Sequence, residues 1–266
     1  MRRAEGHPLR ILLWHVHGAW TSSFVRGRPE YLLPLSSEGG PWGRGRCDRA
    51  WPSARETSPD ELRNAAVDVV VLRRPEEIEL TERWTGRRPG RDLPTVVEHN
   101  TPTGDVPRTR RPLADQDEIP LVQVTHFHHL MWESGPAPAT VIEHGVVDPG
   151  ERYTGEEPAV GLVMNEPARR GRAVGTDLLP ASMHLGMPVV AVASTETTRA
   201  VPPEAGVVSA DVHELVRAVR DLIADPELAH RMGKQAREHA LAGYALDAFR
   251  RNWDDQLGQM TTGGRA

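Results

Sequence analysis

The sequence predicts an α/β protein built on parallel sheets, and three observations lead to this fold class. Short apolar runs rich in Val, Leu and Ile recur along the chain and alternate with segments of helical periodicity. The connections between these runs are long enough for right-handed βαβ crossovers. The run Val189–Val192 has no polar alternation, so we expect a strand buried on both faces of a parallel sheet.

Length and composition limit the classes of function. The chain has 266 residues, enough for one large or two small domains, and its 38% hydrophobic and 26% charged residues are typical of a folded protein. A net charge of −5 disfavours nucleic acid as a partner. The single cysteine, Cys47, excludes an intramolecular disulfide and fits a reducing cytoplasm. No apolar run approaches the roughly 20 residues of a membrane span. We therefore expect a cytoplasmic protein with no transmembrane segment.

The expected elements divide into two series. Strands of the first half are expected at 9–16, 67–72, 94–100, 121–126 and 140–146. A polar segment, 148–158, follows, and there we divide the chain into domains 1–150 and 151–266. Strands of the second half are expected at 159–164, 189–192 and 206–208. Helices are expected at 211–224, 226–242 and 246–256, with Asp225 capping the second of them.

Residues 36–59 interrupt this alternation. They are rich in Gly, Pro, Arg and Trp without periodicity, which predicts an irregular surface excursion. Trp42 and Trp51 either pack locally or form an apolar platform for an acceptor molecule. At the end of the segment, Ser58-Pro59-Asp60-Glu61 predicts the start of a helix.

Polar residues recur where the expected strands end. They are His17 and Gly18, 98–100, His126, 143–145 and 194–196. The carboxyl ends of parallel strands share one edge of a sheet, where ligands bind in open α/β proteins. His99 is our first choice for a reactive side chain, because an imidazole between Glu98 and Asn100 can hold a ligand hydroxyl or exchange a proton near neutral pH. The alternative is an ordinary hydrogen-bonded loop residue.

Two further clusters have both a chemical and a structural interpretation. His126, His128 and His129 offer three imidazoles, but no carboxylate or cysteine stands at a ligand spacing, so the start of a helix is favoured over a metal site. Arg169 and Arg172 follow the expected strand 159–164. Their guanidinium groups can clamp a diphosphate or remain solvated.

With these residues in view, the chain resembles the family 4 glycosyltransferases of the GT-B fold, specifically a set of actinobacterial members. Residues 141–148, Val-Ile-Glu-His-Gly-Val-Val-Asp, are similar to the family's Val-Ile-Pro-Asn-Gly-Val-Asp. Residues 183–190, Met-His-Leu-Gly-Met-Pro-Val-Val, are similar to its Ala-Met-Ala-x-Gly-x-Pro-Val-Val. The C-terminal pattern at 206–208, 222–227 and 232–233 also matches, so the resemblance covers nearly all of the second half.

The resemblance implies two Rossmann-like domains whose parallel sheets face each other across a cleft. It implies transfer of a hexosyl unit from a nucleoside-diphosphate sugar to an unknown acceptor. The C-terminal domain would hold the donor and the N-terminal domain the acceptor. The resemblance further implies retention of configuration and no cofactor or obligatory metal. His99 matches the histidine near the transferred sugar, Gly18 the loop near the donor phosphates, and Arg169 the phosphate-binding arginine. The remaining candidates for donor binding are Arg172, Ser194, Thr195 and Glu196.

The chain also departs from the family pattern. The phosphate-binding lysine is Val174 here, and Arg172 is the candidate to replace its charge. Part of the donor domain is missing, since 179–183 joins directly to the Gly-x-Pro-Val-Val turn, and Ala181 stands at the second glutamate of the donor motif. A natural deletion, an engineered join and an omitted stretch are the three explanations. The alternative function is therefore a catalytically inactive GT-B-like protein that binds a carbohydrate or a partner.

Overall fold

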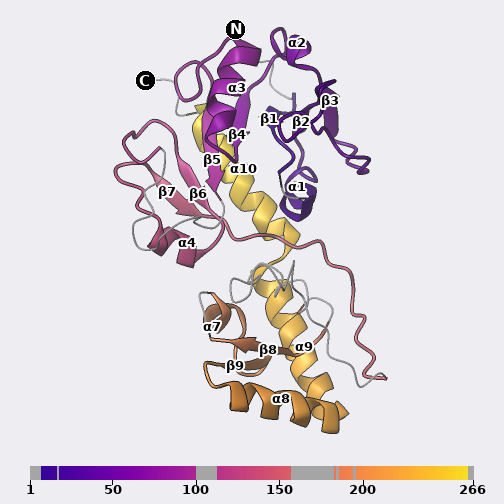
Figure 1. Cartoon of the computed structure of the whole chain (residues 1–266). Helices are drawn as coiled ribbons and strands as arrows, with labels where there is room; N and C mark the ends of the chain where they lie inside the picture. Colours follow the sequence, from indigo (N-terminus) through magenta and orange to yellow (C-terminus); the bar gives the residue numbers. More distant parts are fainter. Residues whose placement is uncertain are drawn as a thin grey trace. The chain divides into compact units, whose positions relative to one another are not determined.

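The computed structural model describes residues 7–16, 18–99, 113–156, 183, 186–193 and 196–262. The chain forms two compact units, which are coloured along the sequence in Figure 1. Unit 1 comprises residues 1–143 together with 250–266, and unit 2 comprises residues 144–249. The last described helix therefore contributes most of its residues, from Arg250 onward, to unit 1.

Unit 1 is organised by a seven-stranded sheet of order β3-β2-β1-β4-β5-β6-β7. Every neighbouring pair in it is parallel. Its strands are β1 (Arg10–Leu13), β2 (Glu30–Pro34), β3 (Ala54–Thr57), β4 (Val69–Leu72), β5 (Thr95–His99), β6 (Leu121–Gln123) and β7 (Ala139–Val141). The chain moves outward from β1 to β3 and returns to the other side of β1 at β4. The switch point, where ligands of open α/β sheets bind, thus lies between β1 and β4.

The short helices of unit 1 connect these strands. They are α1 (Gly18–Phe24), α2 (Pro59–Leu62), α3 (Glu76–Thr85) and α4 (His126–Met131). Helix α2 begins as predicted: Ser58 Oγ accepts from the Glu61 N–H at 3.2 Å, and Glu61 Oε2 accepts from the Ser58 N–H at 2.8 Å. Thr125 caps helix α4, since its Oγ1 accepts from the His128 N–H at 3.0 Å. The histidine run is therefore the start of a helix, as expected.

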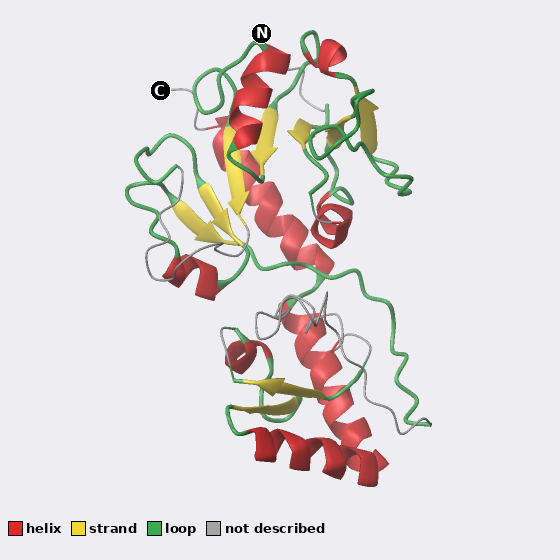
Figure 2. Ribbon diagram, viewed as in Figure 1, coloured by secondary structure: helices red, strands yellow, loops and turns green. Residues whose placement is uncertain are grey.

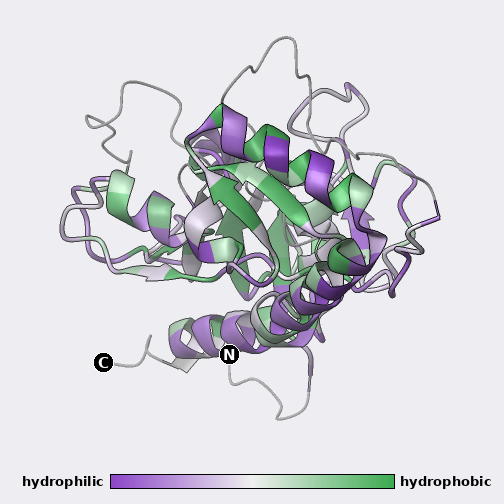
Figure 3. Cartoon of the chain, turned by 90° about the horizontal axis from the view of Figure 1, so that it is seen from below, coloured by the Kyte–Doolittle hydropathy of each residue, from purple (hydrophilic) through white to green (hydrophobic). Residues whose placement is uncertain are grey.

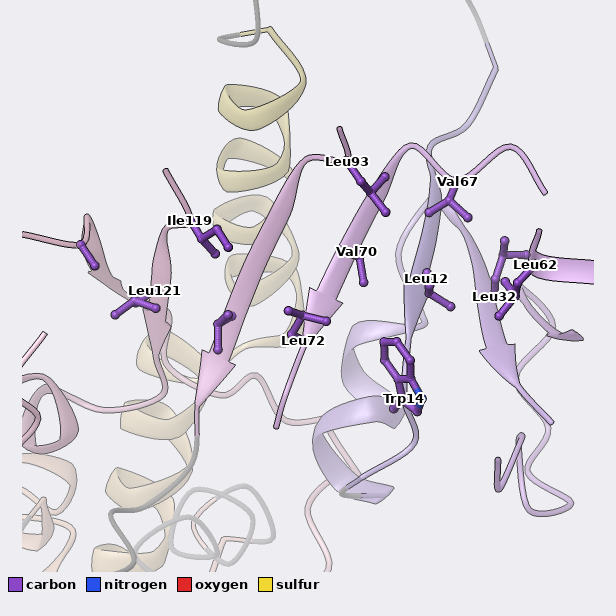
Figure 4. Close-up of a cluster of buried hydrophobic side chains, with 12 residues drawn as sticks. Leu12, Trp14, Leu32, Leu62, Val67, Val70, Leu72, Leu93, Ile119 and Leu121 are labelled. Carbon is purple, nitrogen blue, oxygen red and sulfur yellow. The ribbon is translucent and has the colours of Figure 1, made fainter. Parts of the chain in front are cut away.

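The core of unit 1 follows from the register of the strands. Leu32, Leu12 and Val70 are neighbours across three strands, so their side chains lie on one face of the pleated sheet. Leu72, Val97 and Leu121 form a second such row. Figure 4 shows the buried hydrophobic cluster to which both rows belong, with Trp14 and Leu62 packed against the strands.

Helix α10 (Leu246–Thr262) contributes large apolar side chains to unit 1. Trp253 is 2% exposed, and its ring centre lies 4.9 Å from that of Phe24 and 5.7 Å from that of Trp20. Both contacts are edge-to-face, an arrangement that aromatic rings favour. The C-terminal helix thereby buries the apolar side of α1.

Among its described residues, unit 2 has two parallel strands, β8 (Val189–Val192) and β9 (Gly206–Ser209). Helices α7 (Thr197–Ala200), α8 (Val212–Ala224) and α9 (Pro226–Gly243) accompany them. Asp225 caps α9 as predicted, since its Oδ1 accepts from the Leu228 N–H at 2.9 Å. Arg237 of α9 donates to both carboxylate oxygens of Asp148 at 2.9 Å. This bidentate pair fixes the first residues of unit 2 against α9.

Most expected elements are present among the described residues. Strands β2 and β3 were not expected from the sequence, although each pairs over several residues. The expectation that Val189–Val192 is buried on both faces is wrong, because Val192 is 58% exposed and β8 pairs with β9 alone among the described strands. The expected strand 159–164 lies outside the described residues.

The hydropathy of the strands and helices agrees with the buried cores described above. Figure 3 shows predominantly hydrophobic strands and helices that alternate hydrophobic and hydrophilic residues. None of the helices that the structure describes is both long enough and apolar enough to cross a membrane.

Candidate functional site

Several candidate site residues of unit 1 lie at the carboxyl edge of the first sheet. His15 follows β1, Gly18 is the first residue of α1, and Arg73 follows β4 directly. His99 ends β5 and pairs in register with Gln123, the last residue of β6. The side chain of His99 lies outside the described part of the chain. Its backbone position is nevertheless the strand end expected from the sequence.

Arg73 is buried at the switch point. Its guanidinium carbon lies 4.0 Å from the ring centre of Trp20, so the cation stacks on the indole. The residue is 2% exposed, and its backbone N–H donates to Glu77 Oε2 at 2.6 Å. Since Trp20 belongs to α1, this contact joins the end of β4 to the helix after β1.

Glu77 organises the turn that follows β4. Burial raises the pKa of its carboxyl, while the Arg73 N–H and the charge of Arg74 oppose that rise. Arg74 Nε donates to Glu77 Oε1 at 2.7 Å, and its guanidinium carbon lies 3.9 Å from the ring centre of Trp42. Arg74 Nη2 also donates to the Pro41 carbonyl at 3.1 Å. The turn after β4 is thus attached to the excursion between β2 and β3.

His15 is buried beside the same excursion. Its Nδ1 lies 3.1 Å from the Gly45 carbonyl oxygen, and its ring packs edge-on against Trp51 with 4.8 Å between ring centres. Burial lowers the pKa of His15, the hydrogen bond to Gly45 opposes this, and the charges of Arg49 and Arg44 lower it further. The imidazole is therefore neutral at neutral pH, and Nδ1 is the nitrogen that donates.

Gly18 lies directly against the side chain of Arg49. A methyl group added at Gly18 would stand 2.6 Å from Nη2 and 3.0 Å from Cζ of Arg49. The guanidinium carbon of Arg49 lies 5.8 Å from the ring centre of Trp51, whose Nε1 donates to Ser22 Oγ at 3.2 Å. Trp51 is 4% exposed. The local-packing interpretation of Trp51 is therefore confirmed, and this ring is no exposed platform.

The predicted donor-binding residues belong to other parts of the chain. Glu196 is in unit 2 at the position preceding α7, is 7% exposed and lies 3.7 Å from Arg199 Nε. Gly18 and His99 belong to unit 1. Four predicted residues, Arg169, Arg172, Ser194 and Thr195, lie outside the described residues.

Two features of the site were missed in the sequence. Arg73 and Arg74 directly follow a clearly predicted strand, and this position at a strand end could have identified them as candidate site residues. Arg49 has no such signal, because it reaches Gly18 from an aperiodic segment. Across the described ranges, no three His, Cys, Asp or Glu residues are grouped so that they could share a metal ion.

Comparison with known proteins concerns the fold. The chain matches no protein-family model, and no curated protein sequence is significantly similar to it. Its structure is similar to sucrose-phosphate synthase from Thermosynechococcus elongatus, with a TM-score of 0.64 and 12% identity over 96% of this chain and 100% of that chain. It is also similar to a glycosyltransferase from Rickettsia africae ESF-5, with a TM-score of 0.61 and 10% identity over 97% and 100% of the two chains. The predicted α/β, Rossmann-like GT-B fold is confirmed.

Proposed function

We propose that this protein is a glycosyltransferase that moves a hexosyl unit from a nucleoside-diphosphate sugar to an acceptor, with retention and without an obligatory metal. The observation that carries the proposal is the GT-B fold itself, which the chain shares with two solved glycosyltransferase structures over nearly its whole length. The resemblance at 141–148 and 183–190 supports the same activity. The single cysteine supports action in the cytoplasm.

In this proposal the two parts of the chain have separate roles, with residues 1–150 on the acceptor side and 151–266 on the donor side. His99 binds the transferred sugar near the reaction centre. Arg169 and Arg172 stabilise the negative charge that develops on the leaving diphosphate, because cations aimed at developing charge lower the barrier. Gly18 lies near the donor phosphates, and Ser194, Thr195 and Glu196 hold the donor's sugar or ribose.

Donor binding and turnover test the proposal separately. Isothermal titration with UDP and GDP should give a dissociation constant below the millimolar range for one of them. Release of that nucleoside diphosphate from its glucose or mannose conjugate should fall at least about tenfold in His99→Ala, the cost of losing one good hydrogen bond in the transition state. His129→Ala, which truncates an exposed imidazole of the same unit, is the matched control. Absence of binding by both nucleotides would reject the proposal.

Two further measurements address the finer points. Nuclear magnetic resonance of the product should give the same anomeric configuration as the donor if transfer occurs with retention. Turnover should persist after treatment with EDTA if no metal is obligatory.

A second function has its own supporting observation. Val174 and Ala181 replace a phosphate-binding lysine and a donor-motif glutamate of the resembled family. These replacements favour a GT-B-like protein that binds a carbohydrate or a partner without catalysis. Turnover of any nucleotide sugar that is lost in His99→Ala would exclude it.

A further inference from the structure

The excursion between β2 and β3 reaches both strands that flank the switch point. Residues 35–53, which connect β2 to β3, are drawn as loop in Figure 2. The Gly45 carbonyl of this loop accepts a hydrogen bond at 3.1 Å from His15, which lies just after β1. The Pro41 carbonyl accepts one at 3.1 Å from Arg74 Nη2, in the turn after β4. The excursion therefore crosses the carboxyl edge between β1 and β4, where ligands of open α/β sheets bind.

Backbone hydrogen bonds fix the base of the excursion. The Leu35 N–H donates to the Thr57 carbonyl of β3 at 3.0 Å. Leu35 also forms an antiparallel bridge with Arg44, and the next pair is closed by the Ser36 N–H, which donates to the Gly43 carbonyl at 3.1 Å. Beyond this bridge, residues 36–43 project as a short hairpin tip.

The hairpin tip is held against the turn after β4 by Arg74. Arg74 Nη2 donates to the Pro41 carbonyl, and the guanidinium carbon lies 3.9 Å from the ring centre of Trp42. Among the described residues, no other side chain from outside the tip forms a hydrogen bond or ion pair with it. A methyl group added at Gly39 or Gly40 would meet nothing within 4 Å, so the end of the tip stands free. A single arginine thus connects the tip to the turn after β4.

Arg74 is itself held in place by Glu77. Its Nε donates to Glu77 Oε1 at 2.7 Å, and its backbone N–H donates to Glu77 Oε2 at 3.3 Å. The Glu77 side chain is fully buried, whereas that of Arg74 is 23% exposed. A planar guanidinium can donate to two acceptors and stack on an aromatic ring at the same time. The cation therefore belongs to the fixed part of unit 1, and the tip supplies a carbonyl and a ring that can leave it.

The hairpin tip also forms most of the wall of a cavity. This cavity of about 530 Å³ lies within the excursion, and its volume is in the range of small-molecule sites. Ser37, Gly40 and Pro41 line it from the tip, while Arg44 and Cys47 line it from the following residues. The shape of the cavity therefore depends on where the tip lies.

We propose that residues 36–43 form a strap with two positions and that Arg74 is its latch. In the closed position, which the structure shows, the strap lies against the turn after β4 and walls the cavity. In the open position, Pro41 and Trp42 leave Arg74, the hairpin swings about the bridge between Leu35 and Arg44, and the cavity loses that wall. Loops that move in this way admit a ligand and then shield it from water. The strap goes beyond the proposed function, because its two positions do not depend on which ligand is bound.

Cleavage after Glu38 measures how often the strap is open. Glu38 is exposed in the hairpin tip. A glutamate-specific protease cleaves there only when the surrounding segment has left its folded conformation, so the cleavage rate follows the open population. Mass spectrometry identifies the product, residues 1–38, among the other fragments.

Arg74→Lys tests the latch from the side of the sheet. Lysine keeps a cation beside Glu77, but it cannot also donate to Pro41 and stack on Trp42. The variant should speed cleavage after Glu38 about tenfold, the ratio expected for the loss of one hydrogen bond to a charged group. Arg83→Lys, at an exposed position of α3, is the matched control and should leave the rate unchanged.

Trp42→Ala tests the same contact from the side of the strap. It removes the ring that stacks on Arg74 and leaves the pair of Arg74 with Glu77 intact, so cleavage should become about two- to fivefold faster. The double variant with Arg74→Lys should be no faster than Arg74→Lys alone, because both substitutions remove one contact.

Cys47 provides a second readout. It is the only cysteine of the chain, it is exposed, and it lines the cavity that the strap walls. Alkylation of Cys47 by iodoacetamide should become faster in Arg74→Lys and, to a smaller extent, in Trp42→Ala. Unchanged alkylation in both variants would overturn the assignment of the strap as a movable wall of the cavity.

Urea separates opening of the strap from unfolding of unit 1. Below the unfolding transition, cleavage after Glu38 should hardly depend on urea, because opening of a short tip exposes little surface. Cleavage that accelerates with urea as steeply as global unfolding would overturn the inference. Equal cleavage rates in the wild type, Arg74→Lys and Trp42→Ala would also overturn it, as would effects that multiply in the double variant. None of these measurements uses a nucleotide, so their result is independent of the glycosyltransferase proposal.

Discussion

The guanidinium of Arg73 stacks on the indole of Trp20 at 4.0 Å, and both side chains are buried. The contact joins the end of β4 to α1, the helix after β1, at the point where the strand order of the sheet reverses. A buried arginine is costly to desolvate, so its retention here depends on contacts of this kind.

Arg73→Met should lower the free energy of unfolding of the protein by about 1–3 kcal/mol, because it removes a desolvated cation–π contact and the attraction between the guanidinium and the Glu77 carboxylate. Urea denaturation followed by tryptophan fluorescence measures the change. Arg83→Met, at an exposed position of α3, is the matched control and should stay within about 0.5 kcal/mol of the wild type. Equal stabilities of the two variants would show that the stacked pair contributes nothing.

Stability should rise with pH in the range governed by His15. Its pKa is lowered from 6.5 in the folded protein, chiefly by burial, so the unfolded chain binds more protons between the two pKa values. The free energy of unfolding therefore falls as pH drops through 6.5 toward the folded-state pKa, by at most about 1.4 kcal/mol per pH unit.

His15→Asn keeps a donor near the position of Nδ1 and removes the titration, so its stability should depend less on pH between 5 and 7.5, a window that brackets the ordinary histidine pKa. Urea denaturation at several pH values measures the slope. His129→Asn, which removes an exposed imidazole, is the control. A wild-type slope that His15→Asn leaves unchanged would assign the pH dependence to other groups.

The backbone of the excursion should depend on Gly45. Its φ is +57°, and a methyl group there would clash with Glu56 Oε1 and lie 3.1 Å from a methyl carbon of Leu35. Gly40 is a matched control, because its φ is +77° and an added methyl group would meet nothing within 4 Å.

Gly40→Ala should cost about 1 kcal/mol of unfolding free energy from the left-handed conformation alone. Gly45→Ala should cost at least about 1 kcal/mol more, because the clash adds to that strain. It should also speed alkylation of Cys47 as the loop loosens. If both variants lose the same stability, the close approach to Glu56 is not important for folding.

Trp253 should be essential for the stability of unit 1 although it belongs to the last helix. Trp253→Ala removes a 2% exposed indole from its contacts with Trp20 and Phe24, which should cost about 3–5 kcal/mol. Amide hydrogen exchange should then show lost protection in β1 and α1. Asp255→Ala, at an exposed position of the same helix, should leave the exchange unchanged.

The sequence predicted the elements whose signals are local. The run 67–72 has consecutive valines, and it forms the fully buried strand β4. Ser58 and Asp225 were predicted as caps because each needs only a backbone N–H a few residues away. By contrast, Tyr31-Leu32-Leu33 is a short apolar stretch close to two prolines, Pro29 and Pro34, and strand β2 was missed there.

The site depends on contacts between distant residues, and for that reason it was predicted only in part. The end of β5 at His99 could be expected from the preceding valines. The approach of Arg49 to Gly18 could not, since it depends on how residues 36–53 fold back over the ends of β1 and β2. The exposure of Val192 was missed for the same reason, because composition does not say how many strands flank a run of valines.

The return of α10 to unit 1 has a consequence for synthesis of the protein. The first sheet leaves the ribosome long before Trp253 and Leu257, which are both buried in the finished fold. Until they emerge, Trp20 and Phe24 lack their contacts with Trp253 and present apolar surface to solvent and chaperones. Unit 1, whose sheet is synthesised first, is therefore completed only when α10 has emerged. A nascent chain stalled before residue 250 should be captured by chaperones more readily than the released protein.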